Sequence, residues 1–291
     1  MNLDFGYKDK VCVVTGGSNG IGKAVAELLV SLGAKVYVLD IYECKVPGIT
    51  KFISCNLSDK NEIDKAFEII PKEIYSFFGV AGMAGFNTDY ITTFNANFTS
   101  NKYMVDKYVK WRMKEGASIL FVSSTSGSNW IKYKEEQAKY VNCSSWEDTQ
   151  KILEPLARKS PSSFAYMFSK RCLCMYSMLK AVEYSKIGIR VNTILPGSTN
   201  TNMREEFQRS QETIITEADV FEKIADPIEI AYPCIFINSK LASFISGEEL
   251  IVDYSDGAKK KLNLKKDRED ISATNTWVLL KAKQAQNKNA E

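Results

Sequence analysis

The chain has 291 residues, of which 45% are hydrophobic and 25% are charged, an ordinary composition for a globular protein of one large or two small domains. Its mean hydropathy is -0.21, and no apolar run approaches the roughly 20 residues that cross a bilayer, so we predict no membrane span. The first residues lack the apolar stretch of a secretion signal, and we expect a cytoplasmic protein.

Histidine is absent from the chain, which excludes Ser-His-Asp and Cys-His nucleophile systems and every His-ligated metal site. Seven cysteines without a C-x-x-C pair suggest neither a disulfide framework nor a zinc ribbon. We therefore predict no bound metal and free thiols in a reducing compartment. Proton transfer must then fall to Tyr, Lys, Asp, Glu or Cys.

The net charge of +3 is concentrated at the C-terminus. Residues 258–291 hold nine Lys or Arg against four Asp or Glu, so residues 1–257 sum to −2. We interpret residues 258–291 as a basic extension with a solvated surface and expect no binding to nucleic acid. We expect residues 1–257 to form one folded domain, followed by this extension.

Short apolar segments alternate with amphipathic ones along the first 120 residues, which is the pattern of a parallel sheet covered on both faces. Helical crossovers, such as Ile21–Leu32 and a helix from Ser58 to about Ile70, connect most of these segments. The pattern predicts an α/β fold, a doubly wound Rossmann-type single domain with a seven-stranded parallel sheet. The predicted strands are Val11–Val14, Val36–Leu39, Phe52–Cys55, Phe77–Val80, Ile119–Val122, Val191–Ile194 and Leu250–Val252.

Two stretches interrupt this alternation. Residues 127–161 are charged and aromatic with helical segments, and we predict a helical insertion before a helix that begins near Ser162. Residues 198–225 join a strand end to a late helix, and long connections at that edge commonly make lids or binding loops.

A glycine-rich loop, T-G-G-S-N-G-I-G, lies between the first strand and the first helix. Glycines there permit a tight turn and let the backbone approach a pyrophosphate, while the free N–H groups of the helix favour the anion. The loop predicts a dinucleotide site at Gly16, Ser18, Asn19, Gly20, Ile21 and Gly22.

The spacing T-G-x-x-x-G-x-G resembles the short-chain dehydrogenase/reductase family. Asp40 ends the second strand, where a carboxylate can accept hydrogen bonds from an adenosine ribose and repel a 2′-phosphate. No Arg or Lys lies between Gly16 and Gly22 or at position 41. We therefore predict NAD(H) rather than NADP(H) as the cofactor, with a simple turn-forming role for Asp40 as the alternative.

Three further segments resemble cofactor-binding motifs of the family. C-N-L at 55–57 replaces the acidic residue that commonly meets the adenine, and G-V-A-G at 79–82 replaces N-N-A-G, so both asparagines of that motif are missing. P-G-S-T-N-T at 196–201 resembles P-G-x-x-x-T, which holds the carboxamide. The resemblance therefore implies cofactor contacts at Asn56, Leu57, Ala81, Gly82, Thr199 and Thr201.

The pattern Tyr-x-x-x-Lys occurs three times, beginning at Tyr103, Tyr166 and Tyr176. Only Tyr166 falls near the start of a helix that follows a sheet strand, at the edge where such folds bind ligands. Lowering the phenol pKa from about 10 by about three units requires roughly 4 kcal/mol. A cation about 4 Å away supplies that order of energy at an effective dielectric constant near 20. We therefore predict that Tyr166 is the acid–base residue, that Lys170 lowers its pKa, and that both contact the cofactor.

The family resemblance implies two more catalytic residues. Ser124, the second serine of a pair that ends the fifth strand, would hydrogen-bond the substrate oxygen, and we prefer it to Ser123. Asn97 matches the asparagine in the helix before that strand, where it would support a water leading protons to the lysine. Asn95 and Asn101 are the other candidates for this role.

The separation of 42 residues between Ser124 and Tyr166 resembles that of the 3α-hydroxysteroid dehydrogenase/carbonyl reductase branch of the family. This likeness implies NAD(H)-dependent interconversion of a secondary alcohol and a ketone on a small, apolar, steroid-like substrate, by a homodimer or homotetramer. A reductase of small carbonyls or 3-oxoacyl thioesters, and an NAD-binding sensor or scaffold without catalysis, are the alternatives. Two roles of the insertion stay open: to reshape a subunit interface, or to cover substrate with Trp130, Tyr133, Tyr140 and Trp146.

Overall fold

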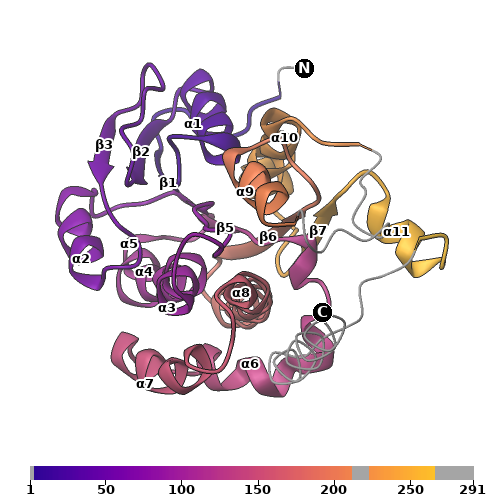
Figure 1. Ribbon diagram of the computed structural model, residues 1–291. Coiled ribbons are helices and arrows are strands. Elements are labelled where there is room, and N and C mark those ends of the chain that lie inside the picture. The colour runs from indigo at the N-terminus through magenta and orange to yellow at the C-terminus, as the bar shows by residue number, and fades with distance from the viewer. Residues whose placement is uncertain (1–2, 212–222, 266–291) are drawn as a thin grey trace, which may run out of the picture.

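The computed structural model describes residues 3–211 and 223–265. In these residues seven strands form one parallel sheet in the order β3-β2-β1-β4-β5-β6-β7 (Figure 1). The predicted doubly wound, seven-stranded fold is confirmed. The strands are β1 Val11–Thr15, β2 Lys35–Asp40, β3 Lys51–Ser54, β4 Ser76–Gly79, β5 Ser118–Val122, β6 Arg190–Pro196 and β7 Glu249–Val252.

The strand order reverses at β1, which pairs with β2 on one side and with β4 on the other. The chain leaves β1 and β4 toward opposite faces of the sheet, so their carboxyl ends border a crevice where such folds bind nucleotides. Every residue of β4, β5 and β6 is buried. Burial on both faces explains why these strands are near-continuous apolar runs rather than alternating patterns.

Helices cover both faces of the sheet. On one face α1 packs against α10 over Val14, Phe78 and Leu120, and on the other α2, α8 and the helical segment 90–112 pack over Val13, Phe77 and Phe121. The helices are α1 Gly20–Ser31, α2 Lys60–Ile69, α3 Tyr90–Phe94, α4 Ser100–Met104, α5 Lys110–Arg112, α6 Lys134–Val141, α7 Trp146–Ala157, α8 Ser163–Ser185, α9 Asn202–Gln211, α10 Pro227–Asn238 and α11 Asp256–Lys261. Segment 90–112 is continuously helical and includes π-helical turns at Asn95–Thr99 and Val105–Val109.

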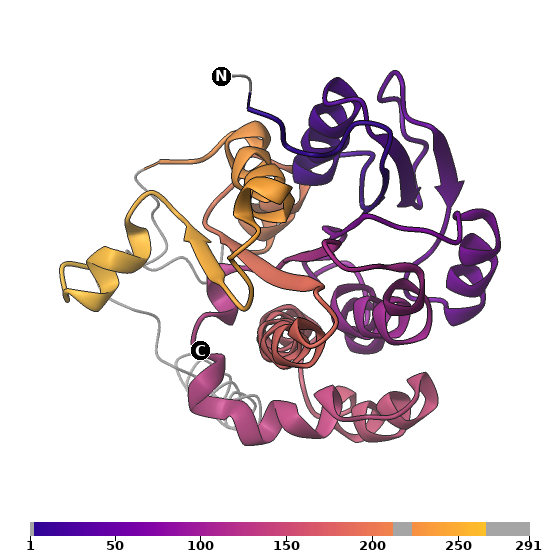
Figure 2. The same cartoon turned by 180° about the vertical axis from the view of Figure 1, so that it is seen from behind.

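The insertion at 127–161 is helical, as predicted, and its helices α6 and α7 lie outside α8 (Figures 1 and 2). Tyr140 packs its ring 5.0 Å from that of Phe168 and is 8% exposed. Trp146 lies 5.6 Å from the ring of Tyr103 and is 9% exposed. Tyr140 and Trp146 are thus packed against helices of the same chain, and the two predicted roles of the insertion stay predictions.

The boundary predicted at residue 257 falls inside α11 (Asp256–Lys261). The carboxylate of Asp256 bonds Lys260 at 2.8 Å and also Lys265, which fixes the beginning of the basic extension. Residues 266–291 lie outside the described residues, so the division at 257 stays a prediction.

The described residues hold neither a disulfide nor a metal-binding cluster, and no helix that could span a membrane. All seven cysteines are free thiols, and six of them are buried. Nowhere in residues 3–211 and 223–265 do three Cys, Asp or Glu side chains gather in a metal-binding group. Each helix in these ranges is too short or too polar to cross a bilayer.

Candidate active site

The glycine-rich loop is a backbone cradle that excludes side chains. Gly16 and Gly20 have φ angles of +70° and +53°, in the left-handed region that favours glycine. A Cβ atom on Gly16 would lie 2.7 Å from the Cα atom of Ala81, and one on Gly22 would lie 2.0 Å from the carbonyl oxygen of Gly16. The loop after β1 thus touches the segment after β4, and the residues present fit the close backbone approach that a pyrophosphate requires.

Asp40 joins the end of β2 to the cradle. Its Oδ2 accepts a hydrogen bond of 3.0 Å from the backbone N–H of Ser18, and its Oδ1 accepts one of 3.1 Å from that of Tyr42. Each carboxylate oxygen has a second lone pair, so these bonds leave acceptor capacity for ribose hydroxyls. Asp40 therefore shapes the turn, as the alternative reading held, and remains able to bind a ribose.

The predicted carboxamide segment closes the cradle from the other side. A Cβ atom on Gly20 would lie 2.9 Å from the methyl carbon of Thr201. Thr199 pairs with Ala225 in a β-bridge, and its hydroxyl donates to the carbonyl of Gly197 at 3.2 Å. The structure thus brings the two predicted cofactor segments, 16–22 and 199–201, into contact.

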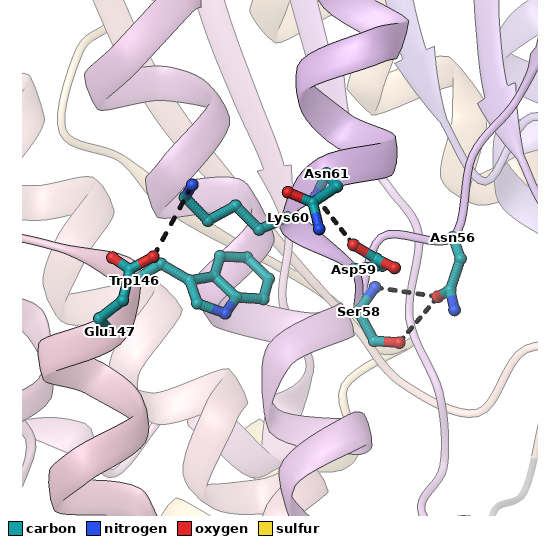
Figure 3. A pocket seen from close by; sticks show the side chains of 7 residues that line it. All are labelled: Asn56, Ser58, Asp59, Lys60, Asn61, Trp146 and Glu147. Atoms are coloured by element: carbon teal, nitrogen blue, oxygen red, sulfur yellow. Dashed lines mark hydrogen bonds and ion pairs between the residues drawn. The ribbon is translucent and has the colours of Figure 1, made fainter.

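Asn56, the predicted adenine contact, lies at one end of a polar surface pocket (Figure 3). The Oδ1 atom of Asn56 accepts hydrogen bonds from the backbone N–H and the hydroxyl of Ser58, at 3.0 and 2.8 Å, which leaves its amide NH₂ to donate to a base. Leu57 is buried, so only its backbone can serve. The pocket contains no predicted catalytic residue and is lined by Asn56, Ser58, Asp59, Lys60, Asn61, Trp146 and Glu147.

Tyr166 and Lys170 lie one turn apart on α8, and the Lys170 Nζ atom is 5.6 Å from the centroid of the Tyr166 ring. The same Nζ donates a hydrogen bond of 2.8 Å to the carbonyl of Val122 at the end of β5. Lys170 is 3% exposed. Burial disfavours its charged form and lowers the pKa of Lys170 to about 8.

The pKa of Tyr166 is raised in this structure. Burial is the larger influence and raises it, while a hydrogen bond with the Ser124 side chain lowers it. The net shift is therefore opposite to the predicted lowering, and burial is its larger cause. A phenol that keeps its proton suits a donor to a carbonyl oxygen.

The two serines after β5 have different partners. The Ser123 hydroxyl donates to the carbonyl of Lys170 at 2.9 Å and accepts from the Cys174 thiol at 3.2 Å. The Ser124 hydroxyl bonds the Ser126 hydroxyl at 2.9 Å and lies close enough to the Tyr166 side chain to lower its pKa. Of the pair, Ser124 lies beside Tyr166, and Ser123 fixes α8 to the strand.

Asn97 lies in the π-helical turn of segment 90–112 and is fully buried. Its amide bonds both the N–H and the carbonyl of Met83, at 2.7 and 3.0 Å, and donates to the Ser169 hydroxyl at 3.1 Å. A Cβ atom on Gly82 would lie 3.3 Å from Asn97 Oδ1 and 3.4 Å from Lys170 Nζ. Asn97 thus holds the backbone after Gly82 close to Lys170.

The two rival asparagines have other roles. Asn95 exchanges hydrogen bonds of 3.1 and 2.8 Å with Gln150 and anchors the insertion. Asn101 donates to the carbonyl of Asn97 at 3.0 Å, and its Oδ1 atom is buried without a partner among the described residues. A Cβ atom on Gly79 would lie 2.4 Å from that Oδ1. The amide of Asn101 therefore occupies space that a side chain at position 79 would need, which explains why the first asparagine of N-N-A-G is replaced by glycine.

Sequence reasoning missed the contribution of α9, in the connection that we predicted as a lid or binding loop. Its Phe207 places a ring centroid 5.1 Å from that of Tyr166. The signal was weak, since an aromatic residue in a polar helix has many possible partners. Residues 212–222 of the same connection lie outside the described residues.

Comparisons with known proteins agree with this geometry. The family described as Enoyl-(Acyl carrier protein) reductase matches residues 16–254. Coniferyl-alcohol dehydrogenase of Pseudomonas sp. is 30% identical over 253 residues, which cover 84% of this chain and 95% of the relative.

Solved structures show the same fold. A short chain dehydrogenase family protein of Francisella tularensis has a TM-score of 0.67 at 27% identity. The match covers 86% of this chain and 99% of the Francisella chain. The 3-alpha-hydroxysteroid dehydrogenase of Pseudomonas sp. B-0831, complexed with NADH, has a TM-score of 0.71 at 19% identity, with 88% and 100% covered; this likeness shows the fold alone. The chain belongs to the short-chain dehydrogenase/reductase family and is an oxidoreductase that acts on CH–OH groups.

Proposed function

We propose that this chain interconverts a secondary alcohol and a ketone on an apolar substrate with NAD(H), and that Tyr166 is its acid–base residue. The observation that carries the proposal is the convergence of Ser124, Tyr166 and Lys170 at the sheet edge where the cradle lies, with the Ser124 side chain beside Tyr166. The Lys170 ammonium lies over the same ring. A nucleotide-binding scaffold has no need for these three side chains together.

Each side chain has a defined role in the proposed reduction. Ser124 and Tyr166 would donate hydrogen bonds to the ketone oxygen, which polarise the carbonyl. The ketone carbon gains a hydride from NADH and its oxygen gains the Tyr166 proton, so that the ketone is reduced as NADH is oxidised. Lys170, protonated below about pH 8, would stabilise the phenolate that remains. Asn97 is a positioning residue, because it bonds Met83, which follows Gly82, and Ser169, which precedes Lys170.

The cofactor contacts are part of the proposal. Their support is the cradle of segment 16–22, closed by Ala81 and Thr201. We propose contacts at Gly16, Ser18, Asn19, Gly20, Ile21, Gly22, Asp40, Asn56, Leu57, Ala81, Gly82, Tyr166, Lys170, Thr199 and Thr201.

The preference for NAD(H) depends on Asp40. Its carboxylate is fixed by two backbone N–H groups, and the next residue, Ile41, is 54% exposed and carries no charge. We expect Asp40→Ala to reduce the preference for NADH over NADPH, measured as the ratio of kcat/KM values. Adding Ile41→Arg should shift the ratio further toward NADPH, since a guanidinium binds a 2′-phosphate. An unchanged ratio in both variants would refute the role of Asp40.

The proposed substrate class has a narrower basis than the proposed reaction. The steroid-like class depends on the branch resemblance alone, since the likeness to the solved hydroxysteroid dehydrogenase shows only the fold. The test is to follow nicotinamide absorbance with the purified chain, either nucleotide, and a panel of steroid ketones, simple ketones and 3-oxoacyl thioesters. Turnover of apolar ketones supports the proposal, whereas nucleotide binding without turnover of any member would favour the sensor or scaffold.

A homo-oligomer is also proposed. Tyr232 and Phe236 lie four residues apart on one face of α10 and are 59% and 45% exposed, an apolar surface that a second copy would cover. Sedimentation should give a dimer or tetramer, and a monomer would refute this part. The cytoplasmic location stays a prediction.

A further inference from the structure

Helix α9 is held against the loop that follows β4. The Oε1 atom of Glu206 accepts hydrogen bonds from the backbone N–H groups of Phe86 and Asn87, at 3.1 and 3.2 Å. Hydrogen bonds to an ionised carboxylate are stronger than those between neutral groups. Glu206 therefore joins two segments that are 120 residues apart in sequence and brings α9 over the catalytic edge of the sheet.

Three aromatic rings meet where α9 approaches α8. The ring centroid of Phe207 lies 5.1 Å from that of Tyr166, with the planes at 76°, and 5.3 Å from that of Phe86, with the planes at 83°. Both are edge-to-face contacts, which the ring quadrupoles favour. Phe207 thus lies between the Phe86 ring and the ring of the proposed acid–base residue.

This aromatic group is separate from the core of the protein. Phe86 and Phe207 belong to neither of the two buried clusters that cover the faces of the sheet, and both are partly exposed. A purely structural role would predict burial of these rings, as for Phe94 and Phe168. The two rings instead form a wall beside the Tyr166 side chain.

A second contact shows how close α9 comes to the reacting groups. A Cβ atom on Gly82 would lie 3.5 Å from the Met203 methyl carbon and 3.4 Å from Lys170 Nζ. Met203 and Phe207 are four residues apart and share a face of the helix. The face of α9 that points toward the catalytic side chains is therefore apolar and polarisable, which suits a flat ring better than a charged or strongly hydrated group.

We propose that Phe86 and Phe207, held in place by Glu206, determine specificity for a ketone or alcohol that bears a flat aromatic ring near the reacting carbon. The inference rests on the proposed function and narrows its substrate class. An aryl ring of the substrate can add an edge-to-face contact to those that Phe207 makes with Phe86 and Tyr166. A saturated ring of similar size buries a comparable area but has no quadrupole, so its contacts with Phe86 and Phe207 stabilise it less.

The test compares matched substrates. The substrates are two pairs of methyl ketones, each reduced with NADH or NADPH. In the first pair a phenyl or a cyclohexyl ring is attached directly to the carbonyl carbon. In the second pair two methylene groups separate the same rings from that carbon. The measured quantity is the ratio of kcat/KM for the phenyl member to that for the cyclohexyl member. Wild type, Phe86→Leu, Phe207→Leu and Glu206→Ala are compared with Trp111→Leu, a control at an exposed aromatic residue on α5. Circular dichroism checks that each variant is folded.

The proposal predicts a ratio above one for wild type and Trp111→Leu in at least one pair. Each phenylalanine variant should lower that ratio by roughly 2- to 12-fold, the worth of one aromatic pair. Glu206→Ala should lower the ratio as well, and Glu206→Gln, which keeps an acceptor oxygen, should restore most of it. Turnover with a ratio near one, or a ratio that the phenylalanine variants leave unchanged, overturns this inference alone. No turnover of any ketone with either nucleotide overturns the proposed function, and this inference with it.

Discussion

The dinucleotide cradle after β1 and the catalytic corner at α8 lie at the same edge of one sheet, but the chain builds them differently. The cradle consists of the backbone of residues 16–22 and of Ala81 and Thr201, which pack against it. A single carbon added at Gly22 would lie 2.0 Å from the carbonyl oxygen of Gly16. The proposed catalytic corner consists of side chains from four parts of the fold. These are Ser124 after β5, Tyr166 and Lys170 on α8, Asn97 in segment 90–112 and Phe207 on α9. A site made of backbone leaves a local pattern in the sequence, whereas a site made of distant side chains depends on the packing of the whole fold.

The cradle should be the less tolerant region. We expect Gly22→Ala to weaken NADH binding by at least about tenfold and to lower the free energy of unfolding by about 1–3 kcal/mol, because the backbone of Gly16 must move. Fluorescence titration and chemical denaturation measure the two effects. Gly116→Ala is the control, since Gly116 has open space around it, although its φ of +85°, unlike that of Gly22, is positive. It should cost about 1 kcal/mol in strain and leave NADH binding unchanged; equal effects of the two variants would contradict the description of the cradle.

The catalytic corner should respond to pH through Lys170. Its pKa is lowered to about 8 by burial, so the ammonium is charged below that pH and neutral above it. If the charge assists Tyr166, kcat/KM for ketone reduction falls as pH rises through about 8, with a limiting slope of about tenfold per pH unit. Lys170→Arg keeps its charge throughout this range and should remove the fall from whatever activity it retains. A profile that is flat well above this pH, or an identical fall in the arginine variant, would show that the ammonium has no such role.

The two regions meet at Gly79 and Asn101, where the smallest expected effect is the coupling between two substitutions. Gly79→Ala places a carbon 2.4 Å from Asn101 Oδ1 and should lower the free energy of unfolding by about 1–3 kcal/mol. Asn101→Ala should cost about 1 kcal/mol, because the Asn97 carbonyl loses a donor. Since the second substitution makes room for the first, the double variant should be less destabilised than the sum by about 0.5 kcal/mol or more. Additive effects in denaturant titrations would mean that the two residues are not in contact.

The sequence was sufficient to predict the features that local patterns encode. Apolar runs of three or four residues predicted the seven strands, and the glycines between β1 and α1 predicted the cradle. The position of Tyr166 near the start of α8 separated it from Tyr103 and Tyr176, which bond instead to Asp64 and Asp106. These predictions needed only periodicity, turn chemistry and the direction of parallel strands.

The remaining features depend on contacts between distant segments. The burial of Tyr140 and Trp146 followed from how α6 and α7 fold back on the chain, and an aromatic residue reads the same whether it lines a site or fills a core. The raised pKa of Tyr166 depends on burial, which no spacing of residues reveals. The contact of Phe207 with Tyr166 depends on a hydrogen-bonded pairing across 120 residues.

One variant tests the central claim, that Tyr166 exchanges the proton in a nicotinamide-dependent reaction. Removing its hydroxyl in Tyr166→Phe should reduce ketone turnover by about 10²–10⁴-fold, while fluorescence titration with NADH gives a dissociation constant within about twofold of wild type. Turnover close to that of wild type, or a wild-type chain that binds neither NADH nor NADPH, would contradict the account.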